Sequence, residues 1–276
     1  MRDDVTTVIL DEIIAHKRQE VAASRQAVPL EAMRRRALAA PRAQDFAAAV
    51  TGPPVRLIAE VKRASPSAGA IRPDADPAAI AGRYQAAGAA AISVLTDRRY
   101  FAGRPEDLPA VRAASALPVL RKDFIVDTYQ MYEARALGAD AVLLIAGAVA
   151  SEDLITLGRL AQELGMTALF EVHTEAHVDL ALAAGAGVIG INNRDLQTLR
   201  VDLDTTRRLR PRIPAGVVVI SESGIETPDD VRRVCAAGID AILVGTALMA
   251  HPDPSAHLRS LRLAAETADQ IGGMVR

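Results

Sequence analysis

The chain has almost no cysteine and few aromatic side chains. Its 276 residues include one cysteine, Cys235, no tryptophan, four phenylalanines and four tyrosines. One cysteine excludes an intrachain disulfide, and no cysteine or histidine spacing resembles a zinc site or a redox pair. We therefore expect a fold that is held together by its hydrophobic core, in a reducing cytoplasm.

An excess of one charge and a long apolar run are also lacking. The chain has 32 basic and 34 acidic residues, a net charge of −2. Nucleic acids and anionic membranes bind clustered basic residues, so neither partner is expected. Uncharged stretches such as Ala141 to Ser151 are far too short to span a membrane. Asp11 and Glu12 interrupt the N-terminal pattern, which therefore differs from a signal peptide.

Eight short apolar runs recur along the chain, each followed by turn residues and a helical pattern. Their starts lie about 20 to 34 residues apart, which is too far for tight hairpins and suits strand–loop–helix–loop units. Nearly every position in them is apolar, which indicates strands covered on both faces of a parallel sheet. The runs are Leu57–Val61, Ala91–Leu95, Pro118–Leu120, Ala141–Ile145, Thr167–Phe170, Val188–Ile191, Val217–Ile220 and Ala241–Val244.

Glycines at a regular interval divide these units into pairs. Gly88, Gly138, Gly185 and Gly238 each end a helical pattern just before a run, and they lie 50, 47 and 53 residues apart. Four periods of two strand–helix units give eight strands, which predicts an α/β fold of the (β/α)₈ TIM-barrel type. The alternative is an open doubly wound sheet, but the G-x-G-x-x-G turn typical of that fold is absent.

Helix N-termini are marked by short polar side chains. Thr227 is followed by Pro228 and by acidic residues in the first turn, which predicts a capped helix start. Asp127 and Gln130 have the spacing of a capping box. Ser151 precedes another helical pattern.

Residues 1–54 precede the first predicted strand. One amphipathic helix is predicted there from the spacing of its buried face, and a short helix is predicted around Phe46, between Pro41 and Pro54. We interpret this segment as a helical cap on a single barrel domain that spans residues 1–276. The face of the first helix consists of Leu10, Ile13, Ile14, Lys17 and Val21.

Charged side chains follow the odd-numbered runs. Glu60 and Lys62, Lys122, Glu171 and Glu222 come where the first, third, fifth and seventh runs end, which is the active face of a barrel. Because strand side chains alternate, Glu60 and Lys62 should point the same way, and Glu171 could meet Lys122 across the mouth. One such charge alone is more simply a rim ion pair. Several together indicate an acid/base cluster in which Lys122 is protonated.

Two glycine-containing turns follow the last two runs. Ser221-Glu-Ser-Gly224 and Gly245-Thr246 let backbone N–H groups approach an anion, at the place where many barrels bind phosphate. The glycines could instead serve only a tight turn. We expect a phosphorylated small-molecule substrate.

Three further segments are candidates for substrate contact. The loop from Lys62 to Pro77 is long and suggests a segment that covers the substrate. Phe101 and Phe124 could form a slot for a ring, or pack under the N-terminal cap. The segment Asn192–Asp195 offers amide groups and the Arg194 guanidinium, or a turn with a surface ion pair.

Two other residues are better explained without a role in the reaction. His173 is expected to close its loop or cap the next helix, and Cys235 is expected in the core.

The ordered motifs resemble those of the indole-3-glycerol phosphate synthase family over nearly the whole chain. The resemblance also includes the N-terminal segment from Ile9 to Arg18. One departure is Ala68, where many relatives have a lysine after Ser-Pro-Ser. The motifs are Ala59-Glu-Val-Lys-Arg-Ala-Ser-Pro-Ser67, Leu120-Arg-Lys-Asp-Phe-Ile125, Glu171-Val-His173, Ile191-Asn-Asn-Arg-Asp-Leu196, Ser221-Glu-Ser-Gly-Ile225 and Val244-Gly-Thr-Ala-Leu-Met249.

The resemblance implies a cytoplasmic carboxy-lyase of tryptophan biosynthesis. It would close the ring of 1-(2-carboxyphenylamino)-1-deoxyribulose 5-phosphate with loss of carbon dioxide and water, without a cofactor or metal, as a monomer or weak homo-oligomer. The matched residues are the general acid Lys122; the acid/base Glu171; the supporting groups Glu60, Lys62 and Asn192; the substrate contacts Ser65, Arg194, Glu222 and Ser223; the apolar slot of Phe101, Phe124 and Leu143; and the phosphate cradle of Gly224, Gly245 and Thr246.

Three other functions remain open from the sequence. A phosphoribosylanthranilate isomerase would resemble this chain in fold, but that family has a cysteine where this chain has Glu60. An aldolase would use Lys122 to form a Schiff base. A barrel could also serve as a non-catalytic interaction subunit, although the retained Glu60, Lys62, Lys122 and Glu171 argue against that.

Overall fold

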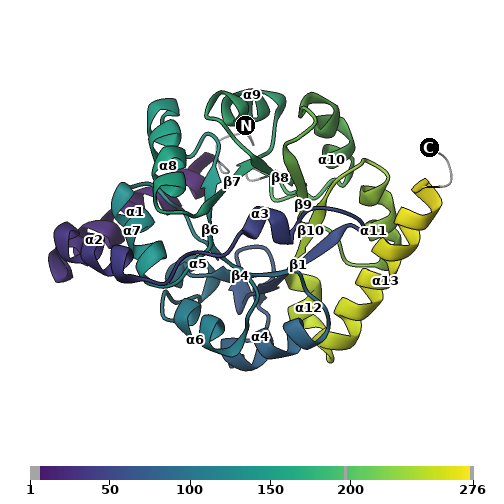
Figure 1. Cartoon of the computed structure of the whole chain (residues 1–276), viewed down its shortest axis with the longest axis horizontal. Coiled ribbons are helices and arrows are strands. Elements are labelled where there is room, and N and C mark those ends of the chain that lie inside the picture. Colours follow the sequence, from purple (N-terminus) through teal and green to yellow (C-terminus); the bar gives the residue numbers. More distant parts are fainter. Residues whose placement is uncertain (1–6, 196–197, 274–276) are drawn as a thin grey trace.

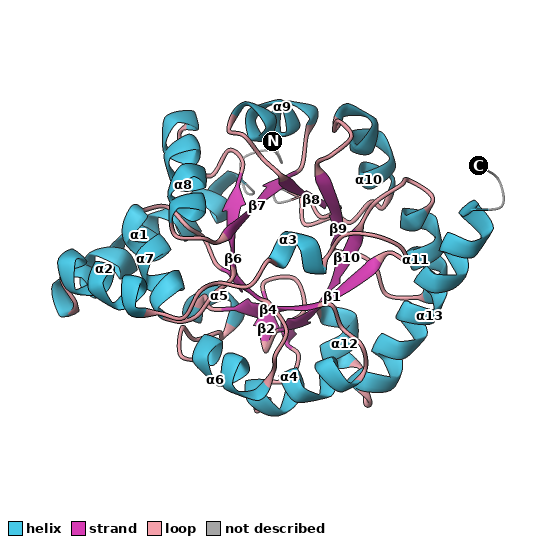
Figure 2. Ribbon diagram, in the orientation of Figure 1, coloured by secondary structure: helices cyan, strands magenta, loops and turns pink. Residues whose placement is uncertain are grey.

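Eight parallel strands form a closed barrel in the computed structural model, which describes residues 7–195 and 198–273. Going around the barrel, the order is β1-β10-β9-β8-β7-β6-β5-β4, so strands that follow one another in the chain are neighbours (Figure 2). This confirms the predicted (β/α)₈ architecture. The barrel strands are β1 (Arg56–Val61), β4 (Ala91–Leu95), β5 (Val119–Lys122), β6 (Ala141–Ile145), β7 (Thr167–Val172), β8 (Val188–Asn192), β9 (Val218–Glu222) and β10 (Ala241–Val244).

Helices surround the barrel and cover the outer faces of its strands (Figure 1). A separate two-stranded hairpin, β2 (Ala64–Ser65) and β3 (Gly69–Ala70), lies in the loop after β1. The helices are α1 (Thr7–Ala27), α2 (Leu30–Ala39), α3 (Phe46–Ala49), α4 (Pro77–Ala86), α5 (Arg98–Phe101), α6 (Asp107–Ala114), α7 (Thr128–Ala136), α8 (Ser151–Glu163), α9 (Glu175–Ala183), α10 (Asp204–Leu209), the 3₁₀ helix η1 (Arg210–Arg212), α11 (Pro228–Cys235), α12 (Thr246–Ala250) and α13 (Pro254–Gly273).

Four strands extend further than the apolar runs predicted. The predicted third, fifth, sixth and seventh strands ended before their polar residues, whereas β5, β7, β8 and β9 include them. Lys122 pairs with Leu95, Glu171 with Ile145, and Glu222 with Asn192 in the ladder. The predicted ends were wrong because hydrophobicity cannot reveal a charged strand residue that has buried partners of opposite charge.

The predicted helix starts are confirmed except in two details, at Ser151 and at Gln130. Ser151 is the first residue of α8 and does not cap it, because the cap position is that of Ala150. Thr227 and Asp230 form a reciprocal capping box at α11. Asp127 caps α7 by accepting a hydrogen bond from the backbone N–H of Tyr129 at 2.7 Å. Gln130 does not complete a box, because its Oε1 accepts from the N–H of Val126 at 2.8 Å. Its longer side chain reaches the residue before Asp127.

The four periodic glycines have the left-handed conformation that their position requires. Gly88, Gly138, Gly185 and Gly238 have φ values between 76° and 90°. Each follows a helix and directs the chain into the next strand, a geometry that a side chain at Cβ would strain. The predicted role of these glycines is therefore confirmed.

The described residues form two large hydrophobic clusters and a third, small one of Val21, Met33 and Tyr129 from α1, α2 and α7. The largest cluster lies between the strands and the surrounding helices, and the second fills the barrel interior. Phe46 and Val50, from and just after α3, belong to the interior cluster together with strand-start residues such as Ile58 and Ala91. Helix α3 therefore closes the N-terminal end of the barrel, and in Figure 1 it lies in front of the ring of strands.

The N-terminal segment contains one helix more than predicted. α1 and α3 match the two predicted helices, and Ile13, Ile14 and Val21 are buried as expected. α2 was not predicted, because its three consecutive arginines leave only Met33 and Ala37 buried. It packs on α7, at one side of the barrel in Figure 1. Residues 1–6 of the predicted cap lie outside the described residues.

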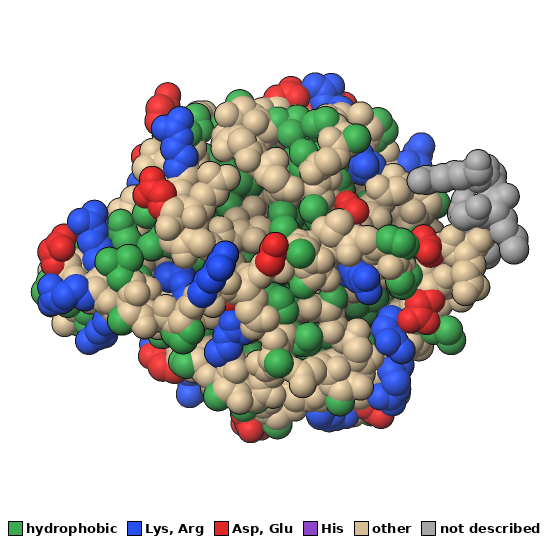
Figure 3. Space-filling model, in the orientation of Figure 1, with side chains coloured by type: hydrophobic (Ala, Val, Ile, Leu, Met, Phe, Trp, Pro, Cys, Tyr) green, Lys and Arg blue, Asp and Glu red, His purple; other side chains and the backbone are tan. Residues whose placement is uncertain are grey.

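Surface charge is mixed, as the composition indicates. On the face seen in Figure 3, basic and acidic side chains alternate with apolar and polar patches. Among the described helices, none has the length and apolar character needed to cross a bilayer.

Candidate active site

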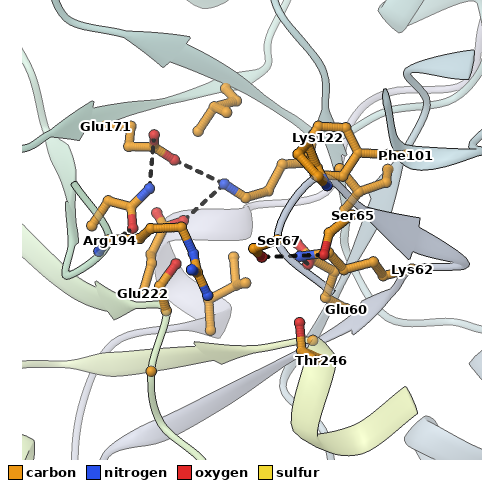
Figure 4. A pocket seen from close by; sticks show the side chains of 18 of the residues that line it. Glu60, Lys62, Ser65, Ser67, Phe101, Lys122, Glu171, Arg194, Glu222 and Thr246 are labelled. Atoms are coloured by element: carbon orange, nitrogen blue, oxygen red, sulfur yellow. Dashed lines mark hydrogen bonds and ion pairs between the residues drawn. The ribbon is translucent and has the colours of Figure 1, made fainter. Parts of the chain in front are cut away.

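One cavity at the C-terminal ends of the strands is lined by every site residue that the sequence predicts (Figure 4). Its base is formed by side chains from β1, β5, β7, β8 and β9, and its walls by the loops that follow them. The predicted residues are Glu60, Lys62, Ser65, Phe101, Lys122, Phe124, Leu143, Glu171, Asn192, Arg194, Glu222, Ser223, Gly224, Gly245 and Thr246.

Lys122 lies between two carboxylates. Its Nζ is 2.9 Å from Oε2 of Glu171 and 2.9 Å from Oε2 of Glu222, as the dashed lines in Figure 4 show. Burial alone would lower the pKa of Lys122, but Glu171, Glu222 and Glu60 outweigh it and hold this pKa above its ordinary value. The predicted contact between Lys122 and Glu171 is therefore confirmed, and Lys122 carries its charge at neutral pH.

Glu171 has three polar neighbours. Besides Lys122, the side chain of Asn192 donates a hydrogen bond to its Oε1 at 3.1 Å. Nε2 of His173 is 3.4 Å from the same oxygen, within ion-pair distance when the imidazole is protonated. Although burial favours the neutral acid, Lys122 and His173 hold the pKa of Glu171 well below its ordinary value. Glu171 is therefore an ionised, hydrogen-bonded carboxylate.

Glu222 is the least satisfied carboxyl of the cluster. It is 1% exposed, and its buried Oε1 has no hydrogen-bond partner among the residues that the structure describes. Burial and the nearby Glu171 charge raise the pKa of Glu222 to about 7, against the opposing effect of Lys122. A Cβ at Gly190, on the neighbouring strand β8, would collide with this same oxygen. The missing side chain at Gly190 thus makes room for the Glu222 carboxyl.

Glu60 and Lys62 form a second polar group beside the first. Lys62 Nζ lies 3.5 Å from Oε1 of Glu60, and the Ser93 hydroxyl donates to Oε2 of Glu60 at 3.0 Å. The predicted common direction of Glu60 and Lys62 is therefore confirmed. Ser93 was missed; its only signal was a hydroxyl within an apolar run. A Cβ at Gly245 would collide with Glu60, so this glycine provides space as well as a turn.

An apolar wall lies next to the two lysines. The rings of Phe101 and Phe124 are 6.2 Å apart, and Lys62 Nζ lies 5.5 Å above the Phe101 ring. Leu10 and Ile13 of α1 also line the cavity. Sequence reasoning placed both on the buried face of a helix but did not connect that helix with the site. Phe101 and Phe124 therefore line the cavity and also lie near the N-terminal cap.

The loop after β1 contains the β2–β3 hairpin. The Ser65 side chain accepts a hydrogen bond from the N–H of Ala68 at 3.1 Å and lies 3.4 Å from the Ser67 hydroxyl (Figure 4). Ser65 is buried at the cavity, whereas Ser67 and Ala68 are exposed. The predicted long loop is thus anchored at Ser65, with an exposed tip.

Two turns, after β9 and after β10, provide backbone groups, and β10 is the barrel neighbour of β1. Ser223 and Gly224 have φ values of 67° and 77°, and a Cβ at Gly224 would collide with Val201. Gly245 precedes the short helix α12, which begins at Thr246. All four candidates line the same side of the cavity, after β9 and β10. Donors from two adjacent loops are thus available to an anionic group.

Arg194 is held in place by its own loop. Its backbone N–H donates to the Asn192 side chain at 3.0 Å, and its Nη1 donates to the backbone oxygen of Leu199 at 2.9 Å. Burial lowers the pKa of Arg194 from its ordinary value. Arg194, labelled in Figure 4, thus lines the cavity with its guanidinium held by the loop that follows β8.

His173 and Cys235, for which no role in the reaction was expected, lie in different surroundings. Thr174, not His173, caps α9, and His173 instead approaches Glu171. Cys235 is partly buried against the larger core cluster, as expected. Within residues 7–195 and 198–273, no group of three or more histidine, cysteine, aspartate or glutamate side chains could hold a metal ion.

Comparisons with known structures give the fold. 3-Hexulose-6-phosphate synthase from Salmonella typhimurium superposes with a TM-score of 0.64 at 16% identity, over 78% of this chain and 100% of that chain. Thiamine phosphate pyrophosphorylase from Pyrococcus furiosus superposes with a TM-score of 0.60 at 19% identity, over 78% and 97%. At these identities the likeness concerns the barrel alone.

Sequence comparisons are more specific. The indole-3-glycerol phosphate synthase family model matches residues 10–261. The synthase of that name from Dechloromonas aromatica is 51% identical over 92% of this chain and 98% of its own length. Its counterpart from Mycobacteroides abscessus is 49% identical over 89% and 90%. Since the match extends over nearly the whole barrel and includes the residues of the cavity, the chain belongs to the indole-3-glycerol phosphate synthase family.

Proposed function

We propose that the chain converts 1-(2-carboxyphenylamino)-1-deoxyribulose 5-phosphate into indole-3-glycerol phosphate, with release of carbon dioxide and water. It would act as a carboxy-lyase of tryptophan biosynthesis in the cytoplasm. The observation that carries this proposal is the Lys122 ammonium between the Glu171 and Glu222 carboxylates, 2.9 Å from each. An apolar wall and two backbone turns lie in the same cavity.

Ring closure needs an acid at the sugar carbonyl. The ring carbon that carries the carboxylate attacks the carbonyl carbon, and Lys122 donates a proton to the carbonyl oxygen as its negative charge develops. The carbon–carboxylate bond then breaks, carbon dioxide leaves, and its electron pair restores the aromatic ring. A lysine whose pKa is raised by carboxylates is suited to this step, because it is fully protonated beforehand.

Dehydration then needs a base and a second proton. Glu171 takes a proton from the carbon next to the ring nitrogen, while the hydroxyl leaves as water and the double bond of the indole forms. Lys62, the second lysine that lines the cavity, supplies the proton to the departing hydroxyl. Asn192 keeps Oε1 of Glu171 in place, and Glu60 keeps Lys62 close to the reacting atoms.

Binding divides the substrate between two sides of the cavity. Its anionic end would accept hydrogen bonds from the turns at Ser223–Gly224 and Gly245–Thr246. Its ring would lie against Phe101, Phe124 and Leu143, with the ring carboxylate near Lys62. Ser65, Arg194 and Glu222 would contact the hydroxyl groups and the carboxylate in between. This division agrees with a substrate that has an aromatic ring with a carboxylate at one end and a phosphate at the other.

The charge on Lys122 argues against the aldolase alternative. A Schiff base forms only from the neutral amine, and the surrounding carboxylates oppose that form. Borohydride treatment with a carbonyl substrate is therefore expected to leave the protein unmodified. A covalent adduct at Lys122 would favour the aldolase.

The test is substitution of the acid. Lys122→Met should lower kcat by about a hundredfold or more, because it removes the proton donor while keeping the length of the side chain. Turnover is followed by the ultraviolet absorbance of the indole product, and thermal unfolding checks that the variant is folded. Lys122→Met with unchanged kcat would exclude the proposed mechanism, and a wild-type protein that forms no indole would exclude the proposed function.

A further inference from the structure

A buried lysine of α1 lies behind the apolar wall of the active site. Lys17 is 4% exposed, and its Nζ is 2.8 Å from Oδ2 of Asp97 and 2.9 Å from Oδ1 of Asp123. Glu20, one turn further along the same helix, is 2.6 Å away. A lysine is rarely buried to this extent unless it is paired. Lys17 therefore connects the N-terminal helix with two separate loops of the barrel.

Each of these aspartates also holds a loop that carries an aromatic ring of the cavity. Asp97 caps α5 by accepting a hydrogen bond from the N–H of Tyr100 at 2.7 Å, and Phe101 is the next residue. Asp123 accepts one from the N–H of Phe124 at 2.8 Å. A single ammonium thus joins the backbone anchors of both rings.

Asp123 is also held by residues of the barrel, through the carboxylate oxygen that does not face Lys17. Oδ2 of Asp123 accepts hydrogen bonds from the Thr96 hydroxyl at 2.6 Å and from Arg121 at 3.0 Å. Arg121 is itself 2.8 Å from Glu133 on α7. Asp123 is therefore fixed through Oδ2 by the barrel, while its Oδ1 faces Lys17. Within the contacts described for residues 7–195 and 198–273, Lys17 and its neighbour Glu20 are the members of this network that come from α1, and Lys17 is the one that reaches the two aspartates.

The same helix also supplies part of the wall. Leu10 and Ile13 line the cavity, and they lie about two turns and one turn before Lys17 on α1. Side chains at this spacing share one helix face. The position of Lys17 therefore determines where this apolar face meets the rings of Phe101 and Phe124.

We propose that Lys17 is a positioning residue that sets the affinity for the aromatic end of the substrate without touching it. It does so by holding α1 and the two ring-bearing loops in a fixed arrangement. The identity of the aromatic ligand rests on the proposed function. The turns assigned to the phosphate follow β9 and β10, and none of the contacts of Lys17 reaches them. The effect should therefore be confined to one end of the substrate.

Substitution of Lys17 by methionine tests this division. Lys17→Met keeps the length of the side chain but leaves Asp97 and Asp123 without their shared cation. We expect KM to rise about tenfold, the scale of a lost apolar contact in a specificity pocket, with kcat changed less than about twofold. Binding of glycerol 3-phosphate, measured by calorimetry, should be unchanged. An unchanged KM, or equal weakening of both ligands, would overturn the proposal.

A matched control uses another ion pair of the same helix. Arg25 is 2.6 Å from Asp127, so Arg25→Met also removes a link between α1 and the barrel. Asp127 caps α7, however, and carries no ring of the cavity. We expect Arg25→Met to keep the wild-type KM. A rise in KM equal to that of Lys17→Met would show that only general attachment of α1 matters, which contradicts the proposal.

Two further variants keep the test informative if Lys17→Met is unstable. Asp97→Asn leaves Lys17 paired with Asp123 and keeps an oxygen to cap Tyr100, so no carboxylate loses its partner. It should raise KM about threefold, again with unchanged glycerol 3-phosphate binding. Lys17→Arg should lie closer to the wild type than Lys17→Met does. Wild-type affinity in Asp97→Asn, or no rescue by arginine, would count against the role of Lys17.

Hydrogen exchange separates this inference from the proposed function. In Lys17→Met or Asp97→Asn, the amides of Tyr100 and Phe124 should exchange faster than in the wild type, whatever the substrate is. Arg25→Met should not show this effect. If the wild-type protein formed no indole, the proposed function would fail, while faster exchange at these two loops would still support the positioning role. Unchanged exchange would refute it.

Discussion

At the scale of single residues, the site gathers more negative than positive charge in a space with little water. Glu60, Glu171 and Glu222 face Lys122 and Lys62, and all three carboxyls are nearly inaccessible. Such a cluster cannot ionise completely without a cost. The cost falls on Glu222, whose pKa is raised and whose Oε1 has no partner in the described part of the chain, while Glu171 and Lys122 keep their charges.

The raised pKa of Glu222 predicts that the protein loses stability as the pH rises. This pKa rises from an ordinary 4.5 to about 7 on folding, so the folded protein binds the proton more tightly than the unfolded chain. The contribution is complete below about pH 4.5 and is lost as pH rises to about 7, an effect of about 3 kcal/mol.

Glu222→Gln removes this titration. We expect it to stabilise the protein more at pH 8 than at pH 5, measured as the difference from the wild type in free energy of unfolding at each pH. Taking that difference cancels the opposite effect of His177 and His257, whose pKa values are lowered. Glu163→Gln, at an exposed position, serves as control. A difference that is equal at both pH values would contradict the assignment.

At the scale of secondary structure, the strands alternate in what they supply. β1, β5, β7 and β9 carry the charged side chains, and the strands between them are mostly apolar, with Ser93 of β4 and Asn192 of β8 as polar exceptions. A strand between two charged neighbours must also leave room for them. β8 does so at Gly190, where any Cβ would collide with the Glu222 carboxyl.

Gly190→Ala is therefore expected to act through the Glu222 side chain of the neighbouring strand β9. The added methyl group would push Glu222 away from Lys122, lowering kcat about tenfold or more and destabilising the fold by about 1–3 kcal/mol. Kinetics and urea unfolding measure the two effects. Gly187→Ala, just before the same strand, has no atom within 4 Å of the new Cβ and should change neither. Full activity in Gly190→Ala would show that the close approach to Glu222 has no role.

At the scale of the whole molecule, the two ends of the barrel have separate tasks. The C-terminal end holds the charged cavity, whereas α3 closes the N-terminal end with apolar side chains. Phe46 is fully buried there and contributes to the cluster inside the barrel. Barrels of this type commonly place catalysis at the first end and stability at the second.

Phe46→Ala tests this separation. The cavity left by the ring should reduce the free energy of unfolding by about 4 kcal/mol. The kcat should stay within about twofold of the wild type at temperatures where the variant is folded. Leu38→Ala on α2, where the side chain is 78% exposed, should change stability by less than about 0.5 kcal/mol. A large loss of kcat in folded Phe46→Ala would show that the two ends are coupled.

Much of this arrangement could be predicted because it depends on residues that are close together in the sequence. The period of the glycines, the apolar runs and the cap at Thr227 depend on neighbours in sequence, and each was confirmed. Residues at strand ends could be assigned to one face because a parallel barrel brings all of those ends together. α2 was missed because its stability comes from contact with α7, and its own pattern is weak.

The sequence by itself determined the eight-stranded barrel and the face that carries the site, and it indicated that Glu171 could meet Lys122. Only the tertiary structure decided that Glu222 is the unsatisfied acid, that Gly190 makes room for it, and that Lys17 connects α1 with both aromatic loops. The reason is physical. Strand and helix periods are set by each residue's neighbours in the chain, whereas burial, charge balance and steric room depend on groups that folding brings together from distant positions.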